Sequence, residues 1–207
     1  RRLQPFWHLK AQAVTVYERT RGYTVPVSPS VRTVQLGGVV LPIENGQFRL
    51  TGLESCRDEV VRDVYYDGLS RAQNPALSAY LTYPGTVSDA ATLAAAAEAG
   101  TVVVPSETKA SLLVREVVSA IIGQVDADRV LEEKVTVELV DLVYRPVYAF
   151  RYRHAGKEGV LEFDGLTGDI RADGTTFEQY LGKIVDPRFL LDVGVEAVNI
   201  FVPGTQL

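Results

Sequence analysis

A short Pro-aromatic segment that occurs twice is the feature that most constrains the fold of this chain. Both copies, Pro5–Lys10 and Pro146–Arg151, have the order proline, apolar, aromatic, any residue, large apolar, cation. Successive side chains of an extended chain point to opposite faces. One face of each copy is then mainly apolar and aromatic: Trp7, Leu9 and Ala11 in the first copy, Tyr148, Phe150 and Tyr152 in the second. Because proline is tolerated at the first residue of a strand, we predict two strands that each begin at such a proline.

The pattern of apolar residues and turn signals predicts an α+β protein made of two antiparallel β-rich halves, which the two Pro-aromatic segments relate as a possible degenerate repeat. In the N-terminal half, residues 1–105, we expect a long strand over 5–20, a hairpin around Asn45-Gly46 and one helix over 90–99. Residues 56–66 are compatible with a short helix. The alternative is one continuous domain excised from a larger protein.

In the second half, residues 106–207, we expect a helix packed on a small antiparallel sheet. Ser106 is a suitable N-cap for a helix over 107–122, whose apolar stripe recurs at a helical spacing. That stripe consists of Leu113, Val117 and Ile121. Strands are expected over 134–143, 147–154, 159–164 and 169–172, and Gly156 lies in the loop that joins the second and third.

A final helix is expected after Asp186-Pro187, which is a strong helix start, and Pro203-Gly204 would end it. Its apolar stripe consists of Leu190, Val193, Ala197 and Ile200. Such a stripe packs on the domain's own core in most proteins, and docking on a partner is the alternative.

Composition limits the classes of protein to which the chain belongs. It has 207 residues, 46% hydrophobic and 23% charged, and no apolar run approaches the ~20 residues needed to cross a bilayer. The net charge of -5 argues against a dedicated nucleic-acid binder. One cysteine, Cys56, and two histidines provide no zinc-ligand spacing, so we expect no metal and no cofactor. The start at Arg1-Arg2 and the absence of Met indicate a segment of a longer protein, for which we favour a cytoplasmic location.

Residues 106–172 resemble PepSY-like domains, in which a helix packs on a small sheet and one hairpin ends in a D-x-x-T-G-x-[VI] turn. The matching residues here are Asp164-Gly165-Leu166-Thr167-Gly168-Asp169-Ile170. The segment from Tyr144 to Gly168 is also similar to a module attached to some bacterial zinc-ribbon proteins, although this chain lacks the cysteines of the ribbon. Both resemblances imply a binding or regulatory module of a bacterial-type protein, with no catalytic residues to carry over.

A basic strip in the acidic second half is the clearest candidate for binding an anionic partner. It consists of Arg145, Arg151, Arg153 and Lys157. If the strand runs unbroken through Pro146, the three arginines project from one face and the aromatic residues from the other. The competing interpretation places the aromatic residues in the core and the cations on the surface, paired across strands with Glu138, Glu158 and Glu162.

Catalytic and metal-binding roles have weaker support in the sequence. His8 and His154 are candidate general bases, but no nucleophile motif accompanies them. Asp164, Asp169 and Asp173 lack the spacing of a calcium loop, and turn geometry explains them more simply.

Three hypotheses about function follow. The first is a non-catalytic protein-interaction or regulatory module of a larger bacterial-type protein, whose partner is another protein or other domains of the parent chain. An alternative is an anion or nucleic-acid accessory domain that uses the basic strip, with binding that falls steeply as salt is added. A third is an unrecognised hydrolase that depends on His8 or His154.

Overall fold

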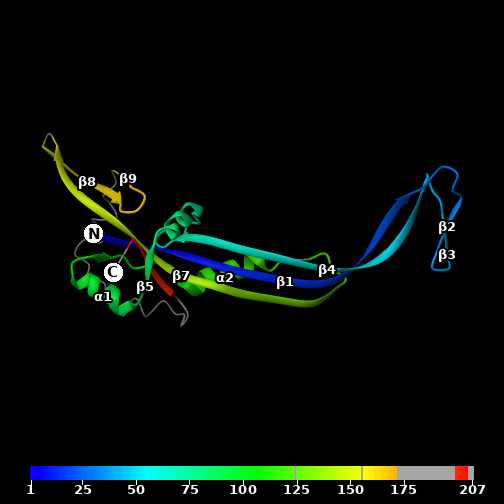
Figure 1. Cartoon of the computed structure of the whole chain (residues 1–207), viewed down its shortest axis with the longest axis horizontal. Coiled ribbons are helices and arrows are strands. Elements are labelled where there is room, and N and C mark those ends of the chain that lie inside the picture. The colour runs from blue at the N-terminus through cyan, green and yellow to red at the C-terminus, as the bar shows by residue number, and fades with distance from the viewer. Residues whose placement is uncertain (124, 155, 172–198, 205–207) are drawn as a thin grey trace. The chain divides into compact units, whose positions relative to one another are not determined.

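The computed structural model describes residues 1–123, 125–154, 156–171 and 199–204, and its architecture is mixed α+β (Figure 1). The elements in chain order are β1 (Arg2–Pro26), β2 (Thr33–Leu36), β3 (Val39–Pro42), β4 (Gln47–Asp67), the 3-10 helix η1 (Pro75–Thr82), β5 (Gly85–Ser88), α1 (Ala90–Glu98), β6 (Val102–Val103), α2 (Ala110–Ile121), β7 (Arg129–His154), β8 (Lys157–Asp164), β9 (Ile170–Arg171) and β10 (Asn199–Pro203).

Most strands belong to one large sheet. Its main path, in the described part of the chain, is β4-β1-β7-β10-β5. Strand β6 joins it beside β1 in parallel, β8 pairs with β7, and β9 pairs with β8. A separate antiparallel sheet is formed by β2 and β3. The predicted α+β class is therefore confirmed.

The chain divides into two compact units. Unit 1 consists of Arg1–Gln12, Val61–Ile121 and Thr136–Leu207, and unit 2 of Ala13–Val60 and Ile122–Val135. The expected boundary between the two halves lies after residue 105. Each compact unit contains residues from both sides of this boundary, because the long strands β1, β4 and β7 run through both units.

The first Pro-aromatic segment lies in the core of unit 1. Trp7, Leu9 and Ala11 share the buried face of β1 as predicted, with exposed fractions of 0%, 1% and 0%. The indole N–H of Trp7 donates a hydrogen bond of 2.8 Å to Ser106 Oγ. The strand begins at Arg2, so the prediction that Pro5 starts it was wrong.

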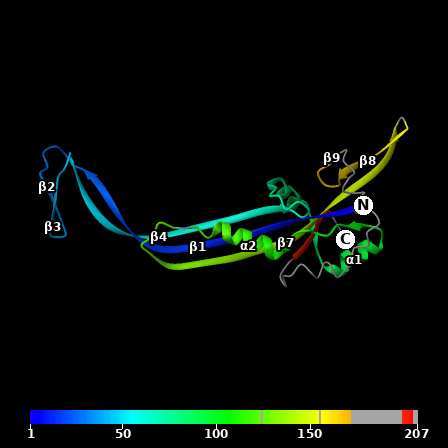
Figure 2. The same ribbon diagram turned by 180° about the vertical axis from the view of Figure 1, so that it is seen from behind.

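The second Pro-aromatic segment has a different environment. Strand β7 runs without interruption through Pro146, so the predicted break between strands over 134–143 and 147–154 was wrong. Tyr148, Phe150 and Tyr152 are 37%, 58% and 47% exposed, so the interpretation that places these aromatic residues in the core was wrong. The reason is that β7 and β8 continue here as a two-stranded hairpin, and in Figures 1 and 2 no described helix of unit 1 covers it.

Residues 56–66 are extended and belong to β4, so the expectation of a short helix was wrong. Within unit 2, the Tyr17 hydroxyl on β1 donates to Asp58 Oδ2, and within unit 1, His8 Nε2 on β1 lies 2.8 Å from Asp63 Oδ1. Pairing with a neighbouring strand outweighs a local helix preference, because propensity is a weak prior compared with tertiary contacts.

The two α-helices of the described residues occupy predicted regions. Helix α1 begins after Asp89, whose carboxylate accepts the Thr92 N–H at 2.7 Å, and it is followed by Gly100 at a φ of 88°. Helix α2 begins at Ala110 rather than at residue 107, and Ser106 hydrogen-bonds with Trp7 instead of capping it. The predicted stripe of α2 is buried: Leu113, Val117 and Ile121. None of the described helices has the length and apolarity needed to cross a membrane.

The C-terminal segment contains a strand where a helix end was expected. Ile200 and its neighbours form β10, which is parallel to β7 at Asp141–Val143 and antiparallel to β5. The predicted helix therefore does not extend to Pro203, because these apolar residues fill a place in the sheet instead. The other residues of its stripe, Leu190, Val193 and Ala197, lie outside the described residues.

Unit 2 contains two tight turns. Asn45 and Gly46 have φ angles of 54° and 77°, as a type I′ turn requires, which confirms the turn predicted at this dipeptide. The predicted hairpin was wrong in its strand pairing, because among the described residues only Glu44 and Gln47 form a bridge beside this turn and β3 does not pair with β4. The second turn comes earlier in the sequence: β2 and β3 pair through a turn at Gly37-Gly38. Close to β1, Glu54 accepts hydrogen bonds from Arg19 Nε at 2.6 Å and from the Tyr23 hydroxyl.

Candidate functional site

The site lies on the hairpin of β7 and β8 in unit 1. The two strands pair antiparallel over eight residues each, from Val147 opposite Asp164 to His154 opposite Lys157. The connecting Gly156 has a φ of 78°, a conformation that glycine adopts without strain. Side chains of directly opposite residues lie on the same face of the hairpin, so the register determines the composition of each face.

One face of the hairpin is apolar and aromatic. The cross-strand pairs on it are Tyr148 with Phe163, Phe150 with Leu161 and Tyr152 with Gly159, and Ile170 of β9 pairs with Phe163. We call these residues the aromatic face: Tyr148, Phe150, Tyr152, Leu161, Phe163 and Ile170. Ile170 is 63% exposed and Phe150 58%, so solvent contacts large apolar side chains here.

Two glycines make room for the tyrosine rings on this face. A Cβ atom at Gly159 would lie 2.7 Å from ring atoms of Tyr152, and one at Gly165 would lie 2.8 Å from Tyr148. The rings therefore lie across backbone that carries no side chain. Tyr148 and Tyr152 remain 37% and 47% exposed in this position.

The opposite face of the hairpin is charged. Arg153 forms an ion pair with its cross-strand neighbour Glu158, and both side chains are exposed. Arg151 is exposed opposite Val160, and among the described residues no ion pair is formed by its guanidinium. The hairpin is thus amphipathic, with aromatic residues on one face and two arginines on the other.

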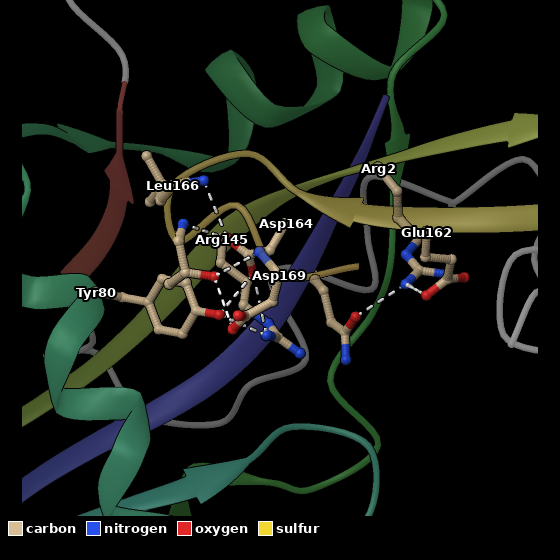
Figure 3. A network of polar contacts seen from close by, with 9 residues as sticks. Arg2, Tyr80, Arg145, Glu162, Asp164, Leu166 and Asp169 are labelled. Atoms are coloured by element: carbon tan, nitrogen blue, oxygen red, sulfur yellow. Dashed lines mark hydrogen bonds and ion pairs between the residues drawn. The ribbon is translucent and has the colours of Figure 1, made fainter. Parts of the chain in front are cut away.

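A buried network at the base of the hairpin joins it to the core of unit 1 (Figure 3). The Tyr80 hydroxyl of η1 donates to Asp164 Oδ2 at 2.5 Å. Arg145 donates to the same hydroxyl at 2.8 Å and to Asp164 Oδ2 at 3.3 Å, and its guanidinium lies 5.3 Å from the centre of the Tyr80 ring. The other carboxylate oxygen accepts the backbone N–H groups of Leu166 and Thr167.

A second buried ion pair lies beside this network. Both terminal nitrogens of Arg2 donate to the carboxylate of Glu162, each at 2.9 Å, and Gln4 accepts a further hydrogen bond from Arg2. The polar cavity between the two clusters has a volume of about 20 Å³, enough for a single water molecule. A cavity of this size is too small for an organic ligand, so we interpret the network as a structural support for the hairpin.

The network determines the ionisation of its members. Burial by itself raises the pKa of Asp164, but hydrogen bonds from Tyr80, Thr167 and Leu166 and the charge of Arg145 together hold that pKa below its usual value. Burial raises the pKa of Tyr80, and its hydrogen bond to Asp164 acts in the same direction. Tyr80 is therefore neutral and Asp164 ionised at neutral pH.

The basic strip is not one continuous surface. Arg145 is buried with Asp164, whereas Arg151 and Arg153 are exposed, and the side chain of Lys157 is outside the part that the structure describes. Among the described side chains, one of the predicted cross-strand pairs is present: Arg153 with Glu158. Glu138 pairs with Lys10, and Glu162 pairs with Arg2.

The two histidines have no described nucleophile beside them. His8 Nε2 lies 2.8 Å from Asp63 Oδ1, and its ring stacks on Tyr65 with centroids 4.5 Å apart. His154 is exposed at the end of β7. Within the described residues, no group of three or more histidine, cysteine or acidic side chains is placed to hold a metal ion.

Asp164 at the end of β8 and Asp169 after it belong to a turn, which agrees with the simpler interpretation of this motif. Asp164 accepts two backbone N–H groups of its own loop, and the Thr167 hydroxyl donates to Asp169 at 2.9 Å. Asp173 lies outside the described residues.

Sequence reasoning missed Tyr80 and Arg2. Their partners are separated from them by 84 and 160 residues, and only the assembled sheet brings them together. Searches of known protein families, curated sequences and solved structures found no match for this chain.

Proposed function

We propose that this chain is a non-catalytic protein-interaction module and that the aromatic face of the β7–β8 hairpin is its contact surface. The observation that carries the proposal is the exposure of Tyr148, Phe150 and Tyr152 at 37%, 58% and 47% on one face. Rings and aliphatic side chains gathered on one exposed surface are typical of protein interfaces, where tyrosine and phenylalanine are enriched.

The support under the hairpin favours the same function. The ion pairs of Arg145 with Asp164 and of Arg2 with Glu162 hold its base, so the aromatic side chains are presented on a prearranged backbone. Prearrangement lowers the entropy lost on binding. The region also includes the turn that resembles PepSY-like domains, and this resemblance implies a binding or regulatory role.

The anion-binding alternative has less support. Of the four cations proposed for it, Arg145 is engaged in a buried ion pair and Arg153 in an exposed one. The hypothesis of a protein partner therefore accounts for more of the exposed surface than the hypothesis of a phosphate-bearing ligand.

Site-specific photo-crosslinking tests the proposal. A photoreactive phenylalanine analogue replaces Phe150 in one protein and Val87, which is 77% exposed on β5, in a matched control. We expect a discrete crosslinked protein from position 150 that is missing from position 87. Identical crosslinking patterns at the two positions, or none at position 150, would contradict the proposal.

A further inference from the structure

One edge of the β7–β8 hairpin has unpaired backbone groups. The Gly165 N–H donates to Pro146 O at 2.9 Å, so this opposite pair is hydrogen-bonded. Bonded and non-bonded pairs alternate along an antiparallel ladder. The odd-numbered residues of β7 from Val147 to Arg153 therefore direct their N–H and C=O groups away from β8.

This edge is open in the described part of the chain. Strand β10 borders β7 only at Asp141–Val143, before the hairpin begins. In Figures 1 and 2 no other described strand lies along the β7 side of the hairpin. An exposed edge of this kind is a template for pairing with another strand.

The charge around the edge favours an acidic partner. Residues 147–161 contain three cations (Arg151, Arg153 and Lys157) and one acid (Glu158), a net charge of +2, although the whole chain has -5. Arg151 has no described ion-pair partner. A second copy of the same hairpin would bring like charges together, so the charge argues against self-pairing.

We infer that the partner contributes an extended segment with alternating apolar and acidic residues, which adds as a strand to the edge of β7 at residues 147–153. Its apolar side chains contact the aromatic face, and its acidic side chains lie on the face of Arg151 and Arg153. Main-chain hydrogen bonds then provide affinity, and the alternating faces provide specificity. This inference rests on the proposed function and specifies the chemistry of the partner.

Synthetic peptides that imitate such a segment test the inference on the whole chain. The probe is a fluorescein-labelled, end-capped octapeptide of alternating valine and glutamate, and binding is measured by fluorescence anisotropy. Two comparison peptides replace glutamate by lysine or valine by serine. We expect the valine–glutamate peptide to bind at least tenfold more tightly than either comparison peptide. Equal binding of the lysine peptide would overturn the assigned charge preference.

A second set of measurements tests strand addition itself. N-methylation of alternate peptide bonds removes donors on one edge of the peptide, and in one of the two methylation registers we expect at least a tenfold loss of affinity. Arg151→Glu is expected to weaken binding, whereas the same change at Arg32, an exposed arginine of unit 2, serves as the matched control and has no effect. Unchanged affinity in both methylation registers, or for Arg151→Glu, would overturn the inference.

The outcomes separate this inference from the proposed function. If no peptide binds but position 150 still crosslinks a discrete protein, strand addition is wrong and the interaction surface stands. If position 150 also fails to crosslink, both are wrong.

Discussion

Two arginines of β7 carry the same charge in opposite surroundings. The side chain of Arg145 is 9% exposed and pairs with Asp164, whose side chain is 7% exposed, whereas Arg151 is exposed on the hairpin. Both arginines occupy odd-numbered positions of one strand, so the sequence predicted that their side chains lie on the same face. It did not predict how deeply each side chain is buried. Burial differs because residue 145 lies at the base of the hairpin, beside Tyr80, and residue 151 lies beyond the core.

Arg145→Met is expected to destabilise the protein by about 3–5 kcal/mol, because it leaves the buried Asp164 carboxylate without its charged partner. The matched change Arg151→Met is expected to cost less than about 0.5 kcal/mol, since that side chain is exposed. Urea unfolding of both variants measures the two values. A loss of unfolding free energy for Arg145→Met as small as that expected for Arg151→Met would show that Arg145 does not stabilise the fold.

Tyr144→Phe is expected to increase the unfolding free energy by about 1 kcal/mol. The Tyr144 side chain is fully buried, and its hydroxyl has no hydrogen-bond partner among the described residues. Burial also raises its pKa far above the usual range. Removing a buried, unsatisfied hydroxyl removes a desolvation penalty. Thermal and urea unfolding of the variant measure the change, and a loss of stability would indicate a partner for this hydroxyl.

At the scale of elements, predictions from sequence succeeded where local signals and tertiary packing agree. Helix α1 has its cap at Asp89, α2 has its stripe at Leu113 and Val117, and the turn at Asn45-Gly46 has the expected backbone angles. Residues 56–66 were misassigned because their partner strand is far away in the sequence. The site was predicted only in part, since alternation identifies a face but does not tell which face the core covers.

The hairpin base is expected to weaken in acid. The folded pKa of Asp164 lies below its usual 3.8, so its contribution to stability is complete above about pH 5 and is lost as the pH falls through the folded pKa. Unfolding free energies of the wild type and Asp164→Asn, measured from pH 7 to pH 2, should approach each other only as the pH falls below 3.8 and through the folded pKa of Asp164. A difference that stays constant over this range would contradict the role given to Asp164.

At the scale of the whole molecule, the two Pro-aromatic segments have different roles despite their similar sequences. Trp7 is fully buried in β1, whereas Tyr148 and Phe150 are exposed on the hairpin. The first segment contributes to the core, and the second carries the surface that we propose contacts a partner. Similar residue order therefore does not indicate a similar environment, because the layers around each strand decide which side chains are covered.

The affinity of purified chain for the protein crosslinked at position 150 tests this account most directly. Isothermal titration would compare the wild type with Phe150→Ser and with Val39→Ser, a control at a side chain that is 60% exposed on β3. Burial of a phenylalanine is worth about 1.5–3 kcal/mol, so we predict at least a tenfold loss of affinity for Phe150→Ser and no change for the control. Equal affinity of all three proteins would contradict the assignment of the aromatic face as the contact surface.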